Sequence, residues 1–213
     1  MVFEITKRCI DIILATILII IFSPIILLVA LAIRFDSPGP ILADTPERVG
    51  KNGTRFYPYK FRSMIINAYY LLKTDPKFKS AYEEQQKGGN YKIKNDPRIT
   101  KVGKFIRKYS LDEIPQFFNM LKGEMSLVGP RPYYPEELKQ QQQRYPQTKN
   151  LVKEVLSVKP GITGHWQVSG RSQVNFDRRI QMDAEYARRR SIIYDFWIIL
   201  KTPWAMISGK GAL

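Results

Sequence analysis

Two adjacent acidic residues, Asp112 and Glu113, are the side chains of this sequence best suited to covalent chemistry. A stiff, basic turn follows them at Gly129-Pro130-Arg131-Pro132. An ionised carboxylate can attack phosphorus directly, and cations held in fixed positions neutralise the phosphoryl oxygens during such a transfer. Acids beside a proline-fixed arginine therefore indicate phosphate chemistry.

A structural role for the same acids has to be weighed against that chemistry. Ser110 and Glu113 have the spacing of a capping box, in which the serine caps a helix and the glutamate folds back onto the serine amide. Pro115 opposes this frame, because it would fall in the second helical turn and remove a backbone hydrogen bond. A helix that starts near Leu111 or Asp112 tolerates Pro115 in its first turn. Both acids then lie at the positive end of the helix, which keeps a carboxylate ionised and attracts phosphate oxygens.

The composition narrows the chemistry that is available. The chain has 213 residues and 44% hydrophobic content, enough for one domain or two small ones. A single cysteine, Cys9, excludes an internal disulfide, and a single histidine, His165, leaves carboxylates as the main catalytic candidates. The formal charge of +15 belongs entirely to residues 37–213, because three basic and three acidic residues cancel within residues 1–36. Such a basic domain indicates nucleic acid, anionic lipid or phosphorylated substrates as partners.

An uncharged apolar run from Ile12 to Ile33 is about long enough to span a bilayer core. It exceeds the roughly 7–15 apolar residues at the core of a signal peptide, which makes a cleaved leader the weaker interpretation. Pro24 removes one backbone hydrogen bond in the middle of the run, so we expect a kink there. Ser23 can return a hydroxyl hydrogen bond to a freed carbonyl, which makes the break tolerable in lipid.

Basic residues flank this run on both sides. Lys7 and Arg8 precede it and Arg34 follows it, so the positive-inside tendency places both ends on the cytoplasmic face. Two arms of about 11 residues would each reach about 16 Å, near half the hydrocarbon thickness. We therefore favour a re-entrant helix over residues 1–36, broken at Ser23-Pro24, rather than a straight spanning helix.

Residues 37–213 predict a single small globular domain of the α+β class with amphipathic helices at its surface. Short strands are expected around the turn Lys51-Asn52-Gly53. The segment Lys101–Lys108 interleaves cations with apolar residues, which suits a helix at a membrane surface or an ordinary helix packed on the core. Trp197 and Trp204, with Lys201 between them, suggest interfacial anchoring, and a buried helix is the alternative.

A series of motifs runs through nearly the whole chain. They are Lys7-Arg8 with Asp11, the broken apolar run, Ser37-Pro-Gly-Pro40, Arg48-Val-Gly50, Tyr59-Lys-Phe-Arg-Ser-Met64, Asp96-Pro-Arg-Ile-Thr100, the stretch 110–132, Lys159-Pro-Gly-Ile-Thr-Gly164, Gln167-Val-Ser-Gly-Arg171, Asp183 with Tyr186, and Asp195. Together they resemble the signature of the bacterial sugar transferase family, the monotopic phosphoglycosyl transferases. Departures are few: Asp44 and Glu47 stand where the family often shows Gln-x-Arg, and His165-Trp166 replaces a more usual apolar or aromatic pair.

The resemblance implies transfer of a sugar-1-phosphate from a UDP-sugar to a polyprenyl phosphate such as undecaprenyl phosphate, releasing UMP and initiating surface polysaccharide or glycoconjugate synthesis. It implies that Asp112 attacks the β-phosphorus to form an aspartyl phosphosugar, with ping-pong kinetics, and that Glu113 acts as base toward the lipid acceptor. Mg²⁺ with Asp112 among its ligands is expected, because the diphosphate charge needs neutralising. The location implied is the cytoplasmic face of the bacterial inner membrane.

Six further residues are predicted to bind substrate. Arg131 is aimed by its two flanking prolines, and a planar guanidinium suits phosphate oxygens. Arg171 follows a glycine in a turn. Lys60 and Arg62 lie on the same face of a strand-like run, because alternate residues of a strand share a face. For each cation, the alternative is a surface ion pair. Asp183 and Asp195 could instead cap a helix, pair with Arg171 or assist metal binding. The six are Lys60, Arg62, Arg131, Arg171, Asp183 and Asp195.

Two other classes of protein compete with this interpretation. A membrane-tethered nucleic-acid binder would account for the charge, but the cations are spread through Gly/Pro-rich turns and no nucleic-acid-binding motif is present. A membrane scaffold would not need the pair Asp112 and Glu113. We expect a UDP-sugar, a polyprenyl phosphate and membrane lipids as partners, and no nucleic acid. A homodimer, the identity of the sugar and the role of His165, either stacking on uracil or lying partly buried in a turn, stay open.

Overall fold

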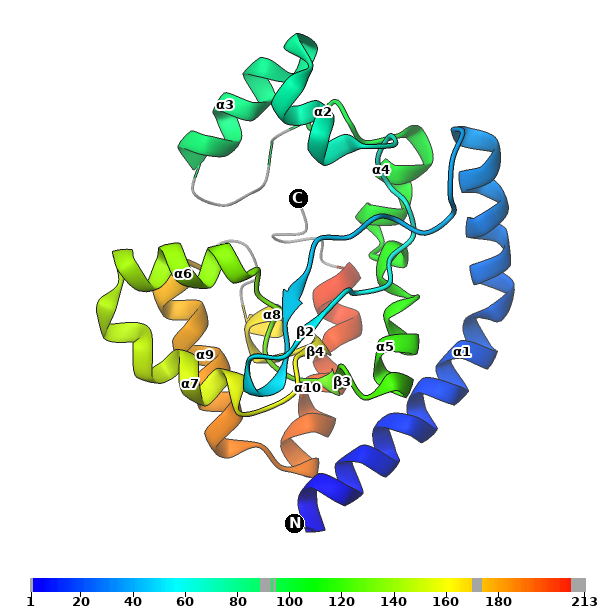
Figure 1. Cartoon of the computed structure of the whole chain (residues 1–213). Helices are drawn as coiled ribbons and strands as arrows, with labels where there is room; N and C mark the ends of the chain where they lie inside the picture. The colour runs from blue at the N-terminus through cyan, green and yellow to red at the C-terminus, as the bar shows by residue number, and fades with distance from the viewer. Residues whose placement is uncertain (1, 89–92, 94, 170–173, 208–213) are drawn as a thin grey trace.

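The computed structural model describes residues 2–88, 93, 95–169 and 174–207. The described part is mostly helical with two small sheets, which is compatible with the predicted α+β class (Figure 1). The α-helices are α1 (Val2–Asp36), α2 (Ala68–Thr74), α3 (Lys79–Gly88), α4 (Lys101–Lys108), α5 (Gln116–Lys122), α6 (Pro135–Arg144), α7 (Lys149–Leu156), α8 (His165–Ser169), α9 (Phe176–Arg189) and α10 (Ile192–Ile207). The strands are β1 (Arg48–Val49), β2 (Arg55–Phe56), β3 (Ser126–Val128) and β4 (Gly161–Thr163), and 3-10 turns cover η1 (Lys51–Gly53), η2 (Pro76–Phe78), η3 (Leu111–Glu113) and η4 (Pro146–Thr148).

Both sheets consist of two strands. β1 and β2 pair antiparallel across η1, which confirms the predicted hairpin around Lys51–Gly53. β3 and β4 pair in parallel, with Ser126 opposite Gly161. An isolated bridge between Val49 and Tyr133 joins the first hairpin to the segment that follows β3.

The apolar N-terminal segment forms α1, a continuous helix that includes Pro24. The hydroxyl of Ser23 donates to the carbonyl oxygen of Ile20 at 2.8 Å, and this is the carbonyl whose usual helical partner Pro24 lacks. The helix is long and apolar enough to cross a membrane, and most of its apolar side chains are exposed, including Leu27 and Leu28. Figure 1 shows α1 along one edge of the molecule, changing direction partway along its length.

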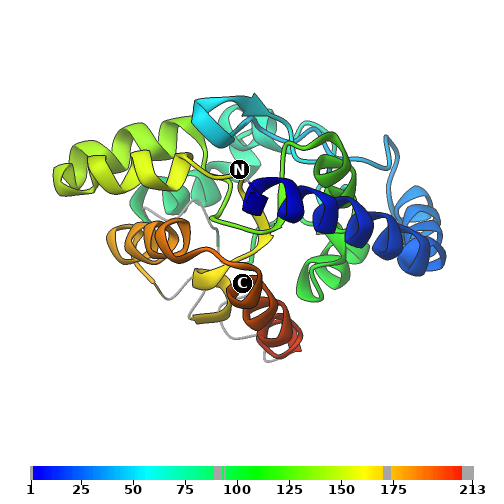
Figure 2. The ribbon, with the colours of Figure 1, turned by 90° about the horizontal axis from the view of Figure 1, so that it is seen from below.

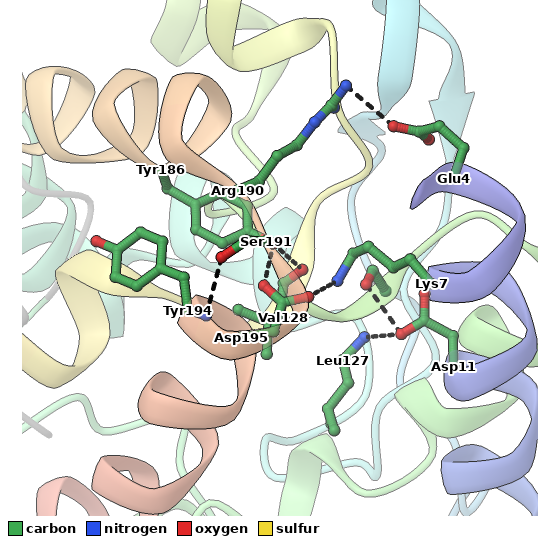
Figure 3. Close-up of polar contacts among 11 residues, drawn as sticks. Glu4, Lys7, Asp11, Leu127, Val128, Tyr186, Arg190, Ser191, Tyr194 and Asp195 are labelled. Atoms are coloured by element: carbon green, nitrogen blue, oxygen red, sulfur yellow. Dashed lines mark hydrogen bonds and ion pairs between the residues drawn. The ribbon is translucent and has the colours of Figure 1, made fainter. Parts of the chain in front are cut away.

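The first three turns of α1 carry a polar face that binds the rest of the molecule (Figure 3). Glu4, Lys7 and Asp11 recur at helical spacing, so they share one side of the helix. The ammonium of Lys7 lies 2.5 Å from the carboxylate of Asp195 in α10. The other oxygen of Asp195 accepts a hydrogen bond from the hydroxyl of Tyr186 at 2.7 Å.

Arg8 and Asp11 extend the same attachment to α5 and β3. The guanidinium of Arg8 donates to the carbonyl oxygens of Met120 and Leu121, at 2.5 and 2.7 Å, in the last turn of α5. One carboxylate oxygen of Asp11 accepts from Ser126 Oγ and from the Leu127 amide, both at 3.0 Å. The N-terminal part of α1 is therefore fixed to the globular body by directional polar contacts.

Apolar packing completes the attachment. Ala15 and Ile33 of α1 lie in one buried cluster with Ile106 of α4 and with Phe117 and Met120 of α5. A second cluster, on the side away from the far half of α1, joins α6, α7 and α9 (Figures 1 and 2). Its buried members are Val49, Tyr133, Leu138, Val152, Val155, Phe176, Ile180 and Ala184.

The predicted helix Lys101–Lys108 is confirmed as α4. Thr100 caps it, since its hydroxyl accepts a hydrogen bond from the Gly103 amide at 2.9 Å. Ile106 is buried in the core, whereas Phe105 is exposed. The helix thus packs on the core by one face and presents an aromatic side chain to the outside on the other.

Candidate active site

The two acids lie in the 3-10 turn η3, immediately before α5. Ser110 has a left-handed backbone and makes no capping bond, so the capping-box alternative is wrong. The predicted helix start near Leu111 is also corrected, because the regular helix begins only at Gln116. Pro115 has no N–H to offer the carbonyl of Leu111, and the Ile114 amide contacts that carbonyl instead, at 3.3 Å, in a 3-10 pattern.

Lys60 meets both acids from a neighbouring segment. Its ammonium lies 2.5 Å from Glu113 Oε1 and 4.0 Å from Asp112 Oδ2. The Phe61 amide donates to the carbonyl oxygen of Asp112 at 2.9 Å, which fixes the two segments side by side. A cation and two carboxylates therefore form one compact charged group.

Burial and charge separate the two acids electrostatically. Burial raises the pKa of Asp112 to about 6, aided by the charge of Glu113 and opposed by Lys60 and Arg107. Burial acts in the same direction on Glu113, but its pairing with Lys60 and the nearby arginines lower the pKa overall. For Lys60, burial is outweighed by the two carboxylates, which raise its pKa. Two carboxyl groups pushed apart in pKa are typical of sites that divide chemical roles between them.

Arg131 is held from two sides. Its backbone amide donates to Asp183 Oδ2 at 3.3 Å, and its guanidinium carbon lies 5.4 Å from the ring centre of Trp166. Gly129 permits this turn, because a side chain there would meet the carbonyl oxygen of Lys159 at 2.4 Å. The Nε of Arg131 is buried without a hydrogen-bond partner among the residues described. The guanidinium thus has donor capacity left for a ligand.

Asp183 lies beneath that turn rather than at its surface. It is fully buried and accepts a hydrogen bond from the hydroxyl of Tyr133 at 2.7 Å. Burial raises the pKa of Asp183 to about 7, although the hydrogen bonds from Tyr133 and the Arg131 amide oppose the shift. The observed contacts make Asp183 a support for the backbone around Arg131.

Two other predicted substrate-binding residues hold α1 in place. The buried guanidinium of Arg62 donates to the carbonyl oxygens of Pro38 and Ser37, at 2.5 and 2.8 Å, in the segment that follows α1. Asp195 pairs with Lys7 as described above. Both side chains are engaged away from the acids, so the structure lends their predicted substrate contacts no support. Arg171, also predicted, lies outside the described residues.

Arg48 was not among the predicted site residues. It opens β1, it is 8% exposed, and its guanidinium carbon lies 3.1 Å from the ring centre of Tyr134. Its charge contributes to the low pKa of Glu113 and so reaches the acids. The motif Arg48-Val-Gly50 marks the position in the sequence, but nothing local shows that the side chain is buried.

His165 lies at the start of α8, edge-on to the rings of Tyr194 and Trp197. These three side chains line a hollow of about 500 Å³ near α9 and α10. Asp112 and Glu113 do not line it. We therefore assign the hollow no part in the chemistry of the acids.

The described residues hold no group of three or more histidine, cysteine, aspartate or glutamate side chains that could enclose a metal ion. Mg²⁺ in phosphate-transfer sites is usually bound by one or two carboxylates together with substrate phosphates and water. Asp112 could supply the carboxylate of such a site. A metal cage made by protein alone would not fit the described residues.

Comparison with known proteins identifies the family of the chain. The family model described as bacterial sugar transferase matches residues 2–209. The chain is 42% identical over 210 residues to the undecaprenyl-phosphate galactose phosphotransferase of Salmonella typhimurium, and 36% identical over 214 residues to the UDP-glucose:undecaprenyl-phosphate glucose-1-phosphate transferase of Escherichia coli. Each alignment covers 97% of this chain but 41% of the relative, so the chain spans about two fifths of their length.

A third relative is close to this chain in length. The exopolysaccharide production protein ExoY of Sinorhizobium fredii is 38% identical over 212 residues, which are 98% of this chain and 88% of the relative. The family match, the long relatives and this shorter one all cover the acid pair and the apolar helix together. The chain belongs to the bacterial sugar transferase family.

Proposed function

We propose that this protein transfers a sugar-1-phosphate from a UDP-sugar to polyprenyl phosphate through a covalent aspartyl intermediate, and so initiates surface polysaccharide synthesis. The observation that carries the proposal is the group formed by Asp112, Glu113 and Lys60, which precedes a helix packed on the long apolar helix α1. The names of two relatives support undecaprenyl phosphate as acceptor and galactose or glucose as the sugar.

In the first step, a carboxylate oxygen of Asp112 attacks the β-phosphorus of the donor. The bond from that phosphorus to the bridging oxygen breaks, and UMP leaves with the oxygen and its electron pair. With a pKa of about 6, Asp112 is roughly nine tenths ionised at pH 7, and it is more basic than an ordinary aspartate. Both properties favour nucleophilic attack.

In the second step, a phosphate oxygen of the lipid acceptor attacks the same phosphorus and releases the carboxylate of Asp112. Glu113 takes the remaining proton of the acceptor phosphate, whose second pKa is about 6. While Glu113 pairs with Lys60 it is a weak base, because that pairing lowers its pKa. Lys60 is the cation within reach of both acids, and its movement to the substrate phosphates would restore the proton affinity of Glu113.

Mg²⁺ is part of the proposal. Asp112 would be the protein's contribution to its binding, with donor phosphate oxygens and water completing the ligands. When bound, the ion would neutralise charge on the transferring phosphoryl group. Lys60 would supply positive charge to the same group from the protein side.

We further propose that α1 is re-entrant and that the globular body lies on the cytoplasmic face of the inner membrane. Both ends of α1 contact the same body: Lys7 and Arg8 attach one end, and Arg62 holds the segment after the other. A helix that crossed the bilayer would carry its two ends to opposite sides. The exposed apolar middle between these attachments is the part that would enter lipid.

The test is covalent labelling of the purified protein in detergent with Mg²⁺. Without acceptor, a UDP-sugar labelled in the sugar should release one equivalent of UMP and leave the label on the protein, and polyprenyl phosphate should then discharge it. Asp112→Asn should retain no label, whereas Asp44→Asn, which removes an exposed carboxylate elsewhere, should behave as wild type. Removal of divalent cations with EDTA should suppress both steps.

The donor panel consists of UDP-galactose, UDP-glucose and the UDP-N-acetylhexoses. Absence of labelling with every donor, in the presence of Mg²⁺, would contradict the proposed function. Labelling that persists in Asp112→Asn would instead move the covalent bond to another residue.

A further inference from the structure

Among the described residues, the buried Arg48 in β1 has no carboxylate partner. Arg48 opens β1 opposite Phe56, and the Val49 amide donates to the Tyr133 carbonyl oxygen at 2.9 Å. These backbone contacts place Arg48 beside the segment that carries Arg131. Its position is therefore set by the sheet and not by a surface loop.

No carboxylate of the described residues lies within 4.0 Å of the Arg48 guanidinium, although the residue is 8% exposed. The Nη1 atom is buried without a hydrogen-bond partner, and burial lowers the pKa of the guanidinium. Its main contact is the ring of Tyr134, at 3.1 Å. A buried guanidinium that has no ion pair and leaves one nitrogen without a partner is costly, and it retains donor capacity for an anion.

Two other buried arginines and the half-buried Arg179 each bind acceptors through at least one nitrogen, although the Nε atoms of Arg62 and Arg179 have no partner. Arg98 makes a bidentate pair with Asp96 at 2.9 and 2.6 Å, Arg62 binds two carbonyl oxygens, and Arg179 pairs with Glu137 at 2.5 Å. Arg48 has none of these acceptors. An anion that arrives with a ligand would supply what it lacks.

Arg131 is the second cation at this position. Its Nε is also buried without a partner, and its charge and that of Arg48 repel each other. The bridge between Val49 and Tyr133 joins the two segments that carry these arginines.

We infer that Arg48, together with Arg131, binds the phosphate that becomes the phosphate of UMP, and that Tyr134 positions the Arg48 guanidinium. The inference rests on the proposed function, in which the β-phosphorus lies at Asp112 and the α-phosphate one bridging oxygen further on. As the bond from the β-phosphorus to that oxygen breaks, the electron pair moves to the leaving phosphate, which gains a negative charge. Two fixed guanidiniums stabilise that charge as it develops.

The test compares binding of UMP with binding of uridine, which lacks the phosphate. In Arg48→Met, the Kd for UMP should rise about 10- to 100-fold, as expected for loss of charge-assisted hydrogen bonds, and the Kd for uridine by less than about 2-fold. Arg55→Met is the matched control. It removes the same charge from the facing strand β2, where Arg55 is exposed and pairs with Glu47 at 3.8 Å, and it should leave both constants unchanged.

Arg48→Lys keeps the charge but not the planar fork, and it guards against a folding defect in Arg48→Met. Its Kd for UMP should rise by a smaller factor, about 3- to 30-fold. Equal weakening of UMP and uridine, or no weakening of UMP in either variant, would overturn the inference. Wild-type protein that releases UMP from a donor while Arg48→Met binds UMP normally would overturn this inference alone. Wild-type protein that releases no UMP would instead overturn the proposed function.

Discussion

Replacement of Lys60 by Met should raise the pKa of Asp112, and the size of the effect follows from the geometry. The ammonium of Lys60 lies 4.0 Å from Asp112 Oδ2, with the two side chains 26% and 13% exposed. At about 4 Å, two unit charges interact by about 1 kcal/mol in water and about 4 kcal/mol at the effective dielectric constant of 20 that suits protein sites. Loss of this attraction corresponds to roughly one to three pKa units above the wild-type value of about 6.

The assay is the pH dependence of the second-order rate constant for the single burst of UMP without acceptor, which reports the ionisation of the free enzyme. Asp112 attacks as the carboxylate, so the rate rises as pH passes its pKa, and in Lys60→Met the midpoint of this rise should move from about 6 to 7 or above. Glu113→Gln removes a neighbouring negative charge and should move the midpoint the other way, below 6. Lys122→Met, which removes an exposed lysine of α5, should leave it unmoved.

The midpoint should therefore move in opposite directions in Lys60→Met and Glu113→Gln. A loss of rate in Lys60→Met with an unmoved midpoint would show that Lys60 binds donor without tuning the nucleophile. A midpoint that moves upward in both variants would refute the assignment of the titration to Asp112.

Three further predictions concern the scaffold. Met120→Ala should lower the free energy of unfolding in detergent by about 2–5 kcal/mol, because Met120 is fully buried in the cluster shared by α1 and α5. A double-mutant cycle of Lys7→Met and Asp195→Asn should give a coupling of about 1–3 kcal/mol, since the pair is short and only 15% and 10% exposed. Asp183 has a folded-state pKa of about 7, above its unfolded value, so its contribution to stability is present at low pH and lost as pH rises to 7. The unfolding free energy of the wild type should fall between pH 5 and pH 8, and in Asp183→Asn this fall should be smaller by about 2–3 kcal/mol.

Each of these has its own contrary result. Unchanged stability of Met120→Ala would mean that α1 and α5 do not pack as observed. Additive effects of the two single substitutions would show that Lys7 and Asp195 do not interact in solution. An unchanged pH slope in Asp183→Asn would show that the carboxyl titrates outside this range.

The sequence identified the acid pair and its helix-breaking proline because both signals are local. Asp112 and Glu113 are adjacent, and Pro115 limits the backbone within a few residues. The same local reasoning placed Lys60 and Arg62 on one strand face but could not tell which of them meets the acids. That choice depends on long-range contacts, with Glu113 for Lys60 and with the segment after α1 for Arg62.

Arg48 shows the limit of local reasoning more clearly. An arginine in a short strand between turns has the pattern of a solvated edge residue. Its burial arises from the bridge between Val49 and Tyr133, which joins segments far apart in the chain. Asp195 is similar, because its partner Lys7 lies at the opposite end of the sequence. Charge isolation and charge pairing are both properties of the fold, and spacing along the chain does not reveal them.

The two attachments of α1 have a mechanical consequence. Arg8 and its neighbours hold the N-terminal end and Arg62 holds the segment after Asp36, so the helix is fixed to one rigid body at both ends. A helix held in this way cannot tilt freely, and its curvature sets how far the middle stands out from the body. Pro24→Ala would favour a straighter rod, and straightening must loosen one of the two attachments. If α1 is re-entrant as proposed, the depth to which it enters a bilayer is set by the spacing of these two attachments and not by the thickness of the lipid.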